Sequence, residues 1–238
     1  RQGNGSIKLN TRIAAFTKSY SYSTLSLSLL NTIRFWRFDL RGRFFAQHSI
    51  GSALPDESAL YFAGANPEEM MDNKFVRSSG FFPNDWQGFG NTSNHFQYGG
   101  GLNLRGYAGY TPIEFVEFKN QRKVYKGKSG AALNAELSFI RLFRTPYAKI
   151  KNYFGLDVYL FGDAGSIDYL KLNKEQKFSA VRADAGLGLM LTIKKWGILD
   201  KPSPLTLRFD APFFLSRPPA DDPDFVKFRW IVAISKAF

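Results

Sequence analysis

The chain has 238 residues, of which 44% are hydrophobic and 16% aromatic, yet its mean hydropathy is only −0.25. No stretch reaches the roughly 20 consecutive apolar residues of a membrane-spanning helix, which excludes a helical membrane protein. Cysteine is absent and His48 and His95 are the two histidines, so disulfides and thiolate sites are excluded and imidazole chemistry has few candidates. The formal charge of +12 fits nucleic acid, anionic headgroups or a cationic lumen, and the placement of the charges must decide.

Alternating apolar and polar segments recur almost to the last residue, and no linker rich in Pro, Gly or Ser divides them. This pattern predicts one domain over residues 1–238. The sequence begins at Arg1 without a basic or hydrophobic leader, so we expect any secretory signal to lie upstream or to have been removed.

The first predicted strands have two different faces. One covers about residues 7–16, and a second starts at Ser23 with leucine at every other position and is expected to end in a turn at Asn31-Thr32. A third runs from Trp36 to Phe44 and sets aromatic residues and leucine against arginine and aspartate. Each of these strands therefore has an apolar face, and the third has a strongly charged face opposite.

A connection of close to 80 residues, about 50–129, follows the third strand. A structureless link of this length is unusual in a compact domain, and such loops are often functional. This one is rich in aromatic residues and contains the run Gly99-Gly100-Gly101. We therefore expect a folded extracellular or lumen-inserted loop.

Further alternating stretches cover residues 131–139, 154–163, 183–193, 205–210 and 228–234. Together with the earlier ones they make about eight strands of roughly 9 to 11 residues, the length that crosses a bilayer. A soluble β-sandwich also alternates, but long strands, charged polar faces and one very long connection favour a membrane barrel. The predicted fold class is all-β, a transmembrane antiparallel β-barrel.

Directly after the glycine run stands the motif Leu104-Arg105-Gly106-Tyr107. It resembles the Val/Leu-Arg-Gly-Phe/Tyr motif in the long loop of the outer-membrane superfamily of BamA, TamA and the two-partner secretion transporters, the bacterial surface antigen barrels. In that superfamily the loop folds back into the lumen and its arginine docks on acidic residues of the following strands. Gly106 would allow a tight backbone turn beside Arg105.

The resemblance extends to acidic residues in the matching order. Glu136 lies on the strand after the loop, and Phe161-Gly162-Asp163-Ala164-Gly165 on the next strand resembles the superfamily signature Phe-x-Asp-x-Gly. Both acids fall on the charged face of their strands. The resemblance implies that Arg105 meets Glu136 and Asp163, since a guanidinium in a partly dehydrated lumen needs carboxylate partners. Gly165 would leave room for the loop against the wall.

The resemblance covers roughly Trp36 to Phe238 and ends in an aromatic last strand, with Trp230 and Phe238 as its C-terminal strand signal. Lys236 interrupts the apolar alternation there. Because the superfamily barrels are sixteen-stranded, the resemblance implies that this chain is the C-terminal half of such a barrel. The rest of the wall would lie upstream or come from another chain, since open strand edges cannot face lipid.

The resemblance implies insertion or translocation of polypeptides at the bacterial outer membrane. The expected partners are outer-membrane lipid, a polypeptide substrate, and accessory lipoproteins or a complementary barrel half, but no nucleic acid. These residues are not expected to be an enzyme: no catalytic residue, metal or cofactor site is predicted. The alternative is a barrel that anchors or exports an upstream peptidase or lipase domain, and a passive anion-attracting pore ranks third.

Overall fold

The structure, a computed structural model, describes residues 3–14, 21–51, 54–72, 96–108, 126–141, 152–170, 176–195, 204–219, 223–234 and 236–238. Within these ranges the chain is mostly antiparallel β-sheet with very little helix. The helices in the described part are too short or too polar to cross a membrane. The predicted all-β class is therefore confirmed. The described residues do not show the sheet closing into a barrel.

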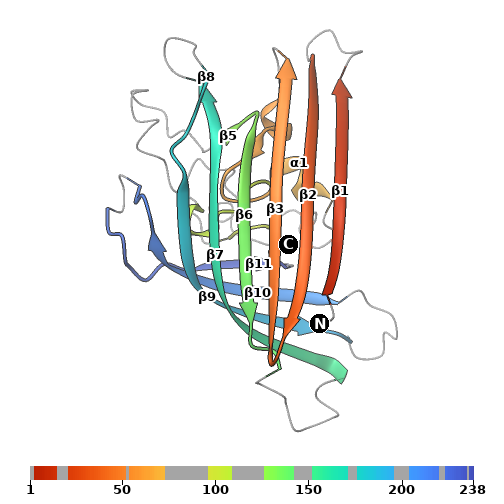
Figure 1. Cartoon of the computed structure of the whole chain (residues 1–238), viewed down its shortest axis with the longest axis vertical. Helices are drawn as coiled ribbons and strands as arrows, with labels where there is room; N and C mark the ends of the chain where they lie inside the picture. Colours follow the sequence, from red (N-terminus) through yellow and green to blue (C-terminus); the bar gives the residue numbers. More distant parts are fainter. Residues whose placement is uncertain are drawn as a thin grey trace.

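Eight strands follow one another in the main sheet, each antiparallel to its neighbour (Figure 1). Sequence neighbours pair throughout, except that the long loop separates the third strand from the next and a short strand, β8 (Gln176–Phe178), pairs only with the end of β7. The eight are β1 (Gly3–Ala14), β2 (Tyr22–Phe35), β3 (Phe38–Gly51), β6 (Gly130–Ser138), β7 (Phe154–Leu170), β9 (Arg182–Ile193), β10 (Leu205–Leu215) and β11 (Ile231–Ile234).

The predicted turn at Asn31-Thr32 is wrong, because β2 continues to Phe35 and the turn is formed by Trp36 and Arg37. Trp36 takes a φ of 51°, as a tight two-residue hairpin requires. Asn31 pairs with Gly5 of β1 on one side and with Gly42 of β3 on the other. This pairing with two strands outweighs the preference of the Asn-Thr sequence for a turn.

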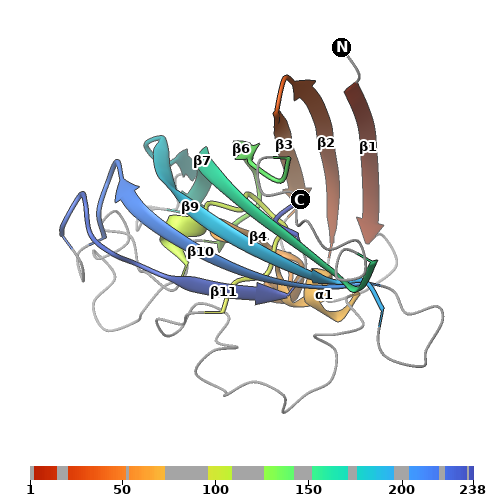
Figure 2. The same cartoon turned by 90° about the horizontal axis from the view of Figure 1, so that it is seen from below.

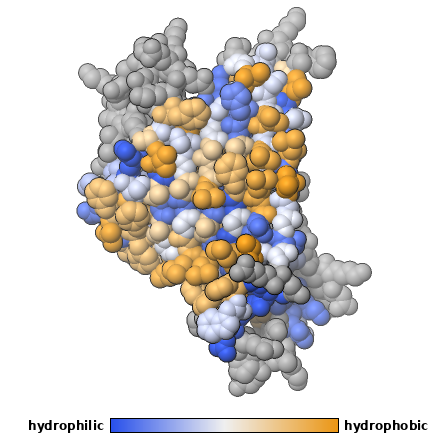
Figure 3. Space-filling view, viewed as in Figure 1, coloured by the Kyte–Doolittle hydropathy of each residue, from blue (hydrophilic) through white to orange (hydrophobic). Residues whose placement is uncertain are grey.

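The register gives the sheet two different faces. One row across β3, β6, β7 and β9 consists of leucines, and the row beside it begins with the pair Arg41 and Glu136. The apolar outer face is open to the surroundings, with Ile7 77% and Leu133 58% exposed, and Figure 3 shows hydrophobic side chains across it. The charged inner face is largely buried. The leucine row is Leu40, Leu137, Leu160 and Leu187.

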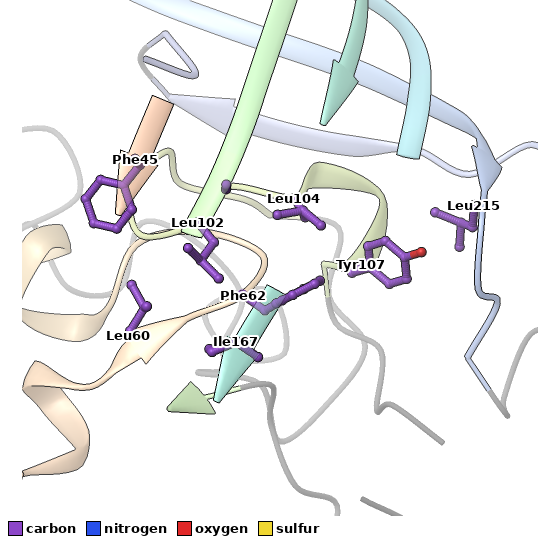
Figure 4. Packing of buried hydrophobic residues seen from close by; sticks show 9 residues of the cluster. Phe45, Leu60, Phe62, Leu102, Leu104, Tyr107, Ile167 and Leu215 are labelled. Atoms are coloured by element: carbon purple, nitrogen blue, oxygen red, sulfur yellow. The ribbon is translucent and has the colours of Figure 1, made fainter. Parts of the chain in front are cut away.

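The long loop packs against the inner face of the sheet, as Figure 2 shows for α1 and β4. Its described parts contain η1 (Asp56–Ser58), β4 (Leu60–Tyr61), α1 (Pro67–Met71), η3 (Arg105–Tyr107) and β5 (Lys126–Gly127). Asn66 and Glu69 form a reciprocal capping box at the start of α1, which explains a helix of only five residues there. Loop and wall share an apolar cluster (Figure 4) of Phe45, Leu60, Phe62, Leu102, Leu104, Tyr107, Ala132, Ile167 and Leu215.

The last strand is shorter than the predicted 228–234. Pro212 on the neighbouring β10 lacks an N–H, and the β9–β10 register shifts between Pro212 and Phe214. A proline and a bulge both interrupt a ladder, so β11 pairs only from Ile231. Trp230 lies just before it and stacks on Phe209, with ring centroids 6.2 Å apart.

The chain leaves the sheet after Ile234, so the expectation that Phe238 ends the last strand is not met. Ala237 is buried, and its carbonyl oxygen accepts a hydrogen bond of 3.2 Å from Asn103 of the loop. Phe238 lines a cavity on the β1–β3 side together with Arg41. The C-terminal residues therefore contact the loop.

The two outer strands of the described sheet, β1 and β11, are not hydrogen-bonded to one another. The outer edge of β11 is instead met by the loop, where Phe96 bridges Val232 in parallel and the Gln97 N–H donates to the Val232 carbonyl oxygen at 2.8 Å. The sheet as described is thus curved and unclosed.

We expect Gly188→Ala to lower the free energy of unfolding by about 1–3 kcal/mol, because overpacking forces a shift of the neighbours. A Cβ at Gly188 would lie 2.1 Å from Cζ of Tyr159, whose ring covers that glycine across the strand pair. Gly42→Ala is the control, since a Cβ there meets nothing within 4 Å. Urea unfolding in detergent measures both, and equal values for the two variants would contradict the prediction.

Candidate functional site

The segment carrying the Arg-Gly-Tyr motif has an unusual backbone. Gly100, Gly101 and Asn103 have φ values of 146°, 50° and 57°, which lie in the region that glycine, and to a lesser degree asparagine, tolerates. The turn brings Leu102 and Leu104 alongside β4 and the residue after it, where their N–H groups donate to the carbonyl oxygens of Tyr61 and Phe62 at 3.1 and 3.0 Å. The glycine run thus directs η3 toward the inner face of the sheet.

The Arg105 side chain is fully buried over the inner face of the sheet, where it contacts the adjacent strands β6 and β7. Its Nε and Nη2 atoms donate to the two carboxylate oxygens of Asp163 on β7, at 2.8 and 3.0 Å. Its Nη1 atom donates to Oε1 of Glu136 on β6 at 2.8 Å. The guanidinium carbon lies 3.9 Å from the ring centre of Phe161, which adds a cation–π contact. The residues singled out in the sequence, Arg105, Glu136, Phe161 and Asp163, are brought together.

Two further acids surround this guanidinium that the sequence reasoning did not assign to it. Asp210 on β10 has a carboxylate oxygen 3.8 Å from Nη1 of Arg105, and Asp184 on β9 lies directly opposite Asp163. Like charges placed opposite each other across a strand pair repel. Both acids have the same inward parity as Asp163, which is the signal that could have identified them.

The ion pairs extend across the inner face beyond Arg105. Arg41 on β3 lies 2.8 Å from Asp157 and 3.4 Å from Glu136, so Glu136 is shared between two arginines. Arg208 lies 3.2 Å from Asp210, which also accepts a hydrogen bond from the Tyr159 hydroxyl. The network therefore joins β3, β6, β7 and β10, and Arg105 of the loop belongs to it.

The charge of Arg105 is secured by its surroundings. Burial lowers the pKa of the Arg105 guanidinium. The charges of Asp163, Asp210 and Glu136 and the hydrogen bonds to Asp163 raise this pKa by more than burial lowers it, so it lies well above its usual range. Five N–H donors in a rigid fork suit this bidentate arrangement, which lysine could not reproduce.

The other motif residues fit the wall by shape. A Cβ on Gly106 would lie 2.5 Å from Leu215 and 2.6 Å from Cβ of Asp184, so only glycine fits there. Leu104 occupies the space beside Gly165, where a Cβ would come within 2.9 Å of its Cδ1 atom. The predicted room for the loop at Gly165 is therefore present.

Tyr107 closes the motif with an apolar and a polar contact. Its ring packs edge-on against Phe62 at 5.6 Å, and its hydroxyl donates to the Ala183 carbonyl oxygen at 3.3 Å (Figure 4 shows the ring facing Phe62). Burial raises the pKa of Tyr107, with the charge of Asp184 acting in the same direction. The hydroxyl therefore remains a donor at neutral pH.

A second set of contacts, which the sequence did not reveal, holds the backbone of the loop. Arg43 donates to the Gly101 carbonyl oxygen at 2.8 Å and to Oδ1 of Asn134 at 3.0 Å. Asn134 in turn donates to the Leu102 and Asn103 carbonyl oxygens at 3.3 and 3.1 Å. These contacts join loop carbonyl groups to side chains of β3 and β6.

The residues of the site hold the long loop on the inner face of the sheet through ion pairs and close packing. In the part of the chain that the structure describes, no group of three or more His, Asp or Glu side chains could bind a metal ion. Comparison with protein-family models, with curated proteins and with solved structures found no match for the chain. Function must therefore be inferred from the site itself.

We expect Arg105→Ala to cost about 3–5 kcal/mol of unfolding free energy, because it leaves buried carboxylates without their cation. Arg34→Ala is the matched control: its partner Asp39 is 4.0 Å away and its side chain is 53% exposed, so the loss should stay below about 1 kcal/mol. Urea unfolding compares the two variants. A loss no larger for Arg105→Ala than for the control would contradict the assigned role.

Gly165→Val is expected to displace Leu104 and loosen the loop, and to strain the β6–β7 pairing locally, because a Cβ there would lie 2.9 Å from both Cδ1 of Leu104 and the Ala131 carbonyl oxygen. Limited proteolysis should then cut the loop several times faster than in the wild type, while the far-ultraviolet circular dichroism still shows a β-sheet spectrum. Gly162→Ala serves as the control, because a Cβ there would have its nearest neighbour 3.7 Å away. Equal cleavage rates in the wild type and Gly165→Val would refute this account.

Proposed function

We propose that this chain forms part of the wall of a transmembrane β-barrel in the bacterial outer membrane that inserts or translocates polypeptides. The observation that carries the proposal is the two-faced sheet, apolar and exposed outside, charged and buried inside. Soluble proteins rarely leave apolar patches larger than a few hundred Å² exposed. Hydrocarbon would cover the outer face, as it does in outer-membrane barrels.

The two outer strands of the described sheet support a composite wall. Backbone groups in hydrocarbon must be hydrogen-bonded, so the outer edge of β1 needs a neighbouring strand. In this proposal that strand comes from a complementary barrel half, and lipid, the polypeptide substrate and accessory lipoproteins are the other partners.

The loop acts as a plug in this proposal. It lies against the inner face, and Arg105 links it to β6 and β7. A buried ion pair gives little net stability when intact but costs several kcal/mol when one partner leaves, which favours two discrete states over gradual loosening. The Arg-Gly-aromatic motif and the Phe-x-Asp-x-Gly signature, which resemble those of the superfamily, add support for a moving polypeptide as the cargo.

The test uses the full-length protein reconstituted into lipid vesicles. Protection of the sheet from added protease measures insertion, and transfer of an unfolded outer-membrane polypeptide into or across the vesicle measures activity. We expect Arg105→Ala to reduce transfer at least tenfold, with Arg34→Ala as control, while insertion persists. A wild-type protein that stays fully accessible to protease would overturn the membrane assignment.

The same assay separates transfer from anchoring. Normal insertion with transfer that is absent in the wild type, or unchanged in Arg105→Ala, would argue against the transfer function and for the anchoring alternative. In that case the loop contacts would serve stability alone.

A further inference from the structure

Each of the eight strands either begins or ends along one edge of the sheet. We call this edge the short-turn rim, because it contains the two-residue β2–β3 turn. The register places there the starts of β1, β3, β7 and β10 and the ends of β2, β6, β9 and β11. The long loop leaves from the other end, after Gly51 of β3. The two ends therefore differ in the length of their connections.

The short-turn rim is basic. Asp39 is the acid nearest the strand ends among the described residues of this rim, and it lies 4.0 Å from Arg34 and 3.1 Å from Arg141. Glu136 and Asp157, two and three positions from the ends of their strands, are buried and paired with Arg41. The described basic residues that lie within one position of these strand ends, or beyond them, are exposed to solvent. They are Arg34, Arg37, Arg141, Lys194, Lys195 and Lys236.

An apolar groove of about 400 Å³ lies on the outer face beside this rim. Leu191, Leu205, Leu207 and Ile234 of three adjacent strands contribute to its floor, and Phe96 of the loop borders it beyond β11. Its one charged lining residue is Arg208, which is paired with Asp210 on the inner face. The groove itself offers only hydrocarbon contact.

Two lysines follow strands of the groove at the rim, Lys195 after β9 and Lys236 after the chain has left β11. Lys195 follows two positions after Ile193, which pairs with Leu205, and Lys236 follows two positions after Ile234, which pairs with Leu207. Both are exposed. The surface thus offers alkyl contact along the strands and cationic groups at one end.

We propose that this groove binds an anionic phospholipid, with an acyl chain along β9–β11 and the phosphate at Lys195 and Lys236. The inference rests on the proposed membrane location and adds a lipid class to it. Basic residues next to a membrane surface attract anionic headgroups, and two of them should favour an anionic over a zwitterionic lipid by about tenfold or more.

An acidic polypeptide fits the groove less well. The floor is made of paired strands whose N–H and C=O groups already bond to one another, and the β11 edge is met by Phe96 and Gln97. A peptide backbone lying there would lose its hydrogen bonds to water without replacement, whereas an alkyl chain has none to lose.

The test measures lipid retention by the full-length protein in mixed micelles of detergent with equal parts phosphatidylglycerol and phosphatidylcholine. Lipid that remains bound after purification is quantified by mass spectrometry. We expect about tenfold enrichment of phosphatidylglycerol in the wild type and loss of that enrichment in Lys195→Gln/Lys236→Gln. Leu207→Trp, which fills the groove and keeps the charges, should lower the retention of both lipids.

The matched control is Arg217→Gln/Lys227→Gln, which removes two exposed charges at the opposite end of β10 and should keep the enrichment. Equal enrichment in both double variants would overturn the inference, as would loss of enrichment when polyglutamate is added as a competitor.

Insertion is scored separately, by protease protection in phosphatidylcholine vesicles. A wild type that inserts there but shows no lipid preference in micelles contradicts this inference alone, and a wild type that does not insert contradicts the proposed function.

Discussion

The structure depends on one buried cation. Arg105 is held away from solvent between Glu136 and Asp163, with Asp184 and Asp210 close by, so acidic side chains of four strands meet at one guanidinium, while Arg41 and Arg208 are second partners of Glu136 and Asp210. Without it these carboxylates would repel one another across the sheet. The loop therefore contributes the cation bound by Asp163, in addition to packing on the four strands.

Small residues and aromatic rings allow the loop to pack closely on the inner face of the sheet. Gly106 and Gly165 remove side chains where loop and wall approach most closely, and Tyr159 uses the space above Gly188 to reach Asp210. The guanidinium of Arg105 can lie about 3 Å from the carboxylate oxygens of Asp163 and Glu136 only if no neighbouring side chain occupies that space. The ion pairs therefore depend on the small residues around them. The electrostatic contacts depend on this close packing because burial strengthens them.

Alternation along the sequence predicted most of the strands and their two faces, because a period of two fixes which side chains share a face. The contact of Arg105 with Glu136 and Asp163 was expected instead from the resemblance of the loop motif and the two strands to a known superfamily. Alternation could not predict where β2 turns, since pairing with Gly5 and Gly42 decides that, nor the shortening of β11 opposite Pro212. The roles of Arg43 and Asn134 also stayed hidden. They hold backbone carbonyl groups, and no side-chain pattern reports where a loop backbone will lie.

The hydrogen bond from Asn103 to Ala237 joins residues 134 positions apart. Such a contact forms only when nearly the whole chain is available, and distant contacts are slow to form because loop closure comes first. This contact is thereby expected to form late in folding, after the loop contacts of shorter sequence separation. Loss of the last few residues would therefore remove this long-range contact, while Arg43 and Asn134 would still hold the neighbouring carbonyl groups of the loop.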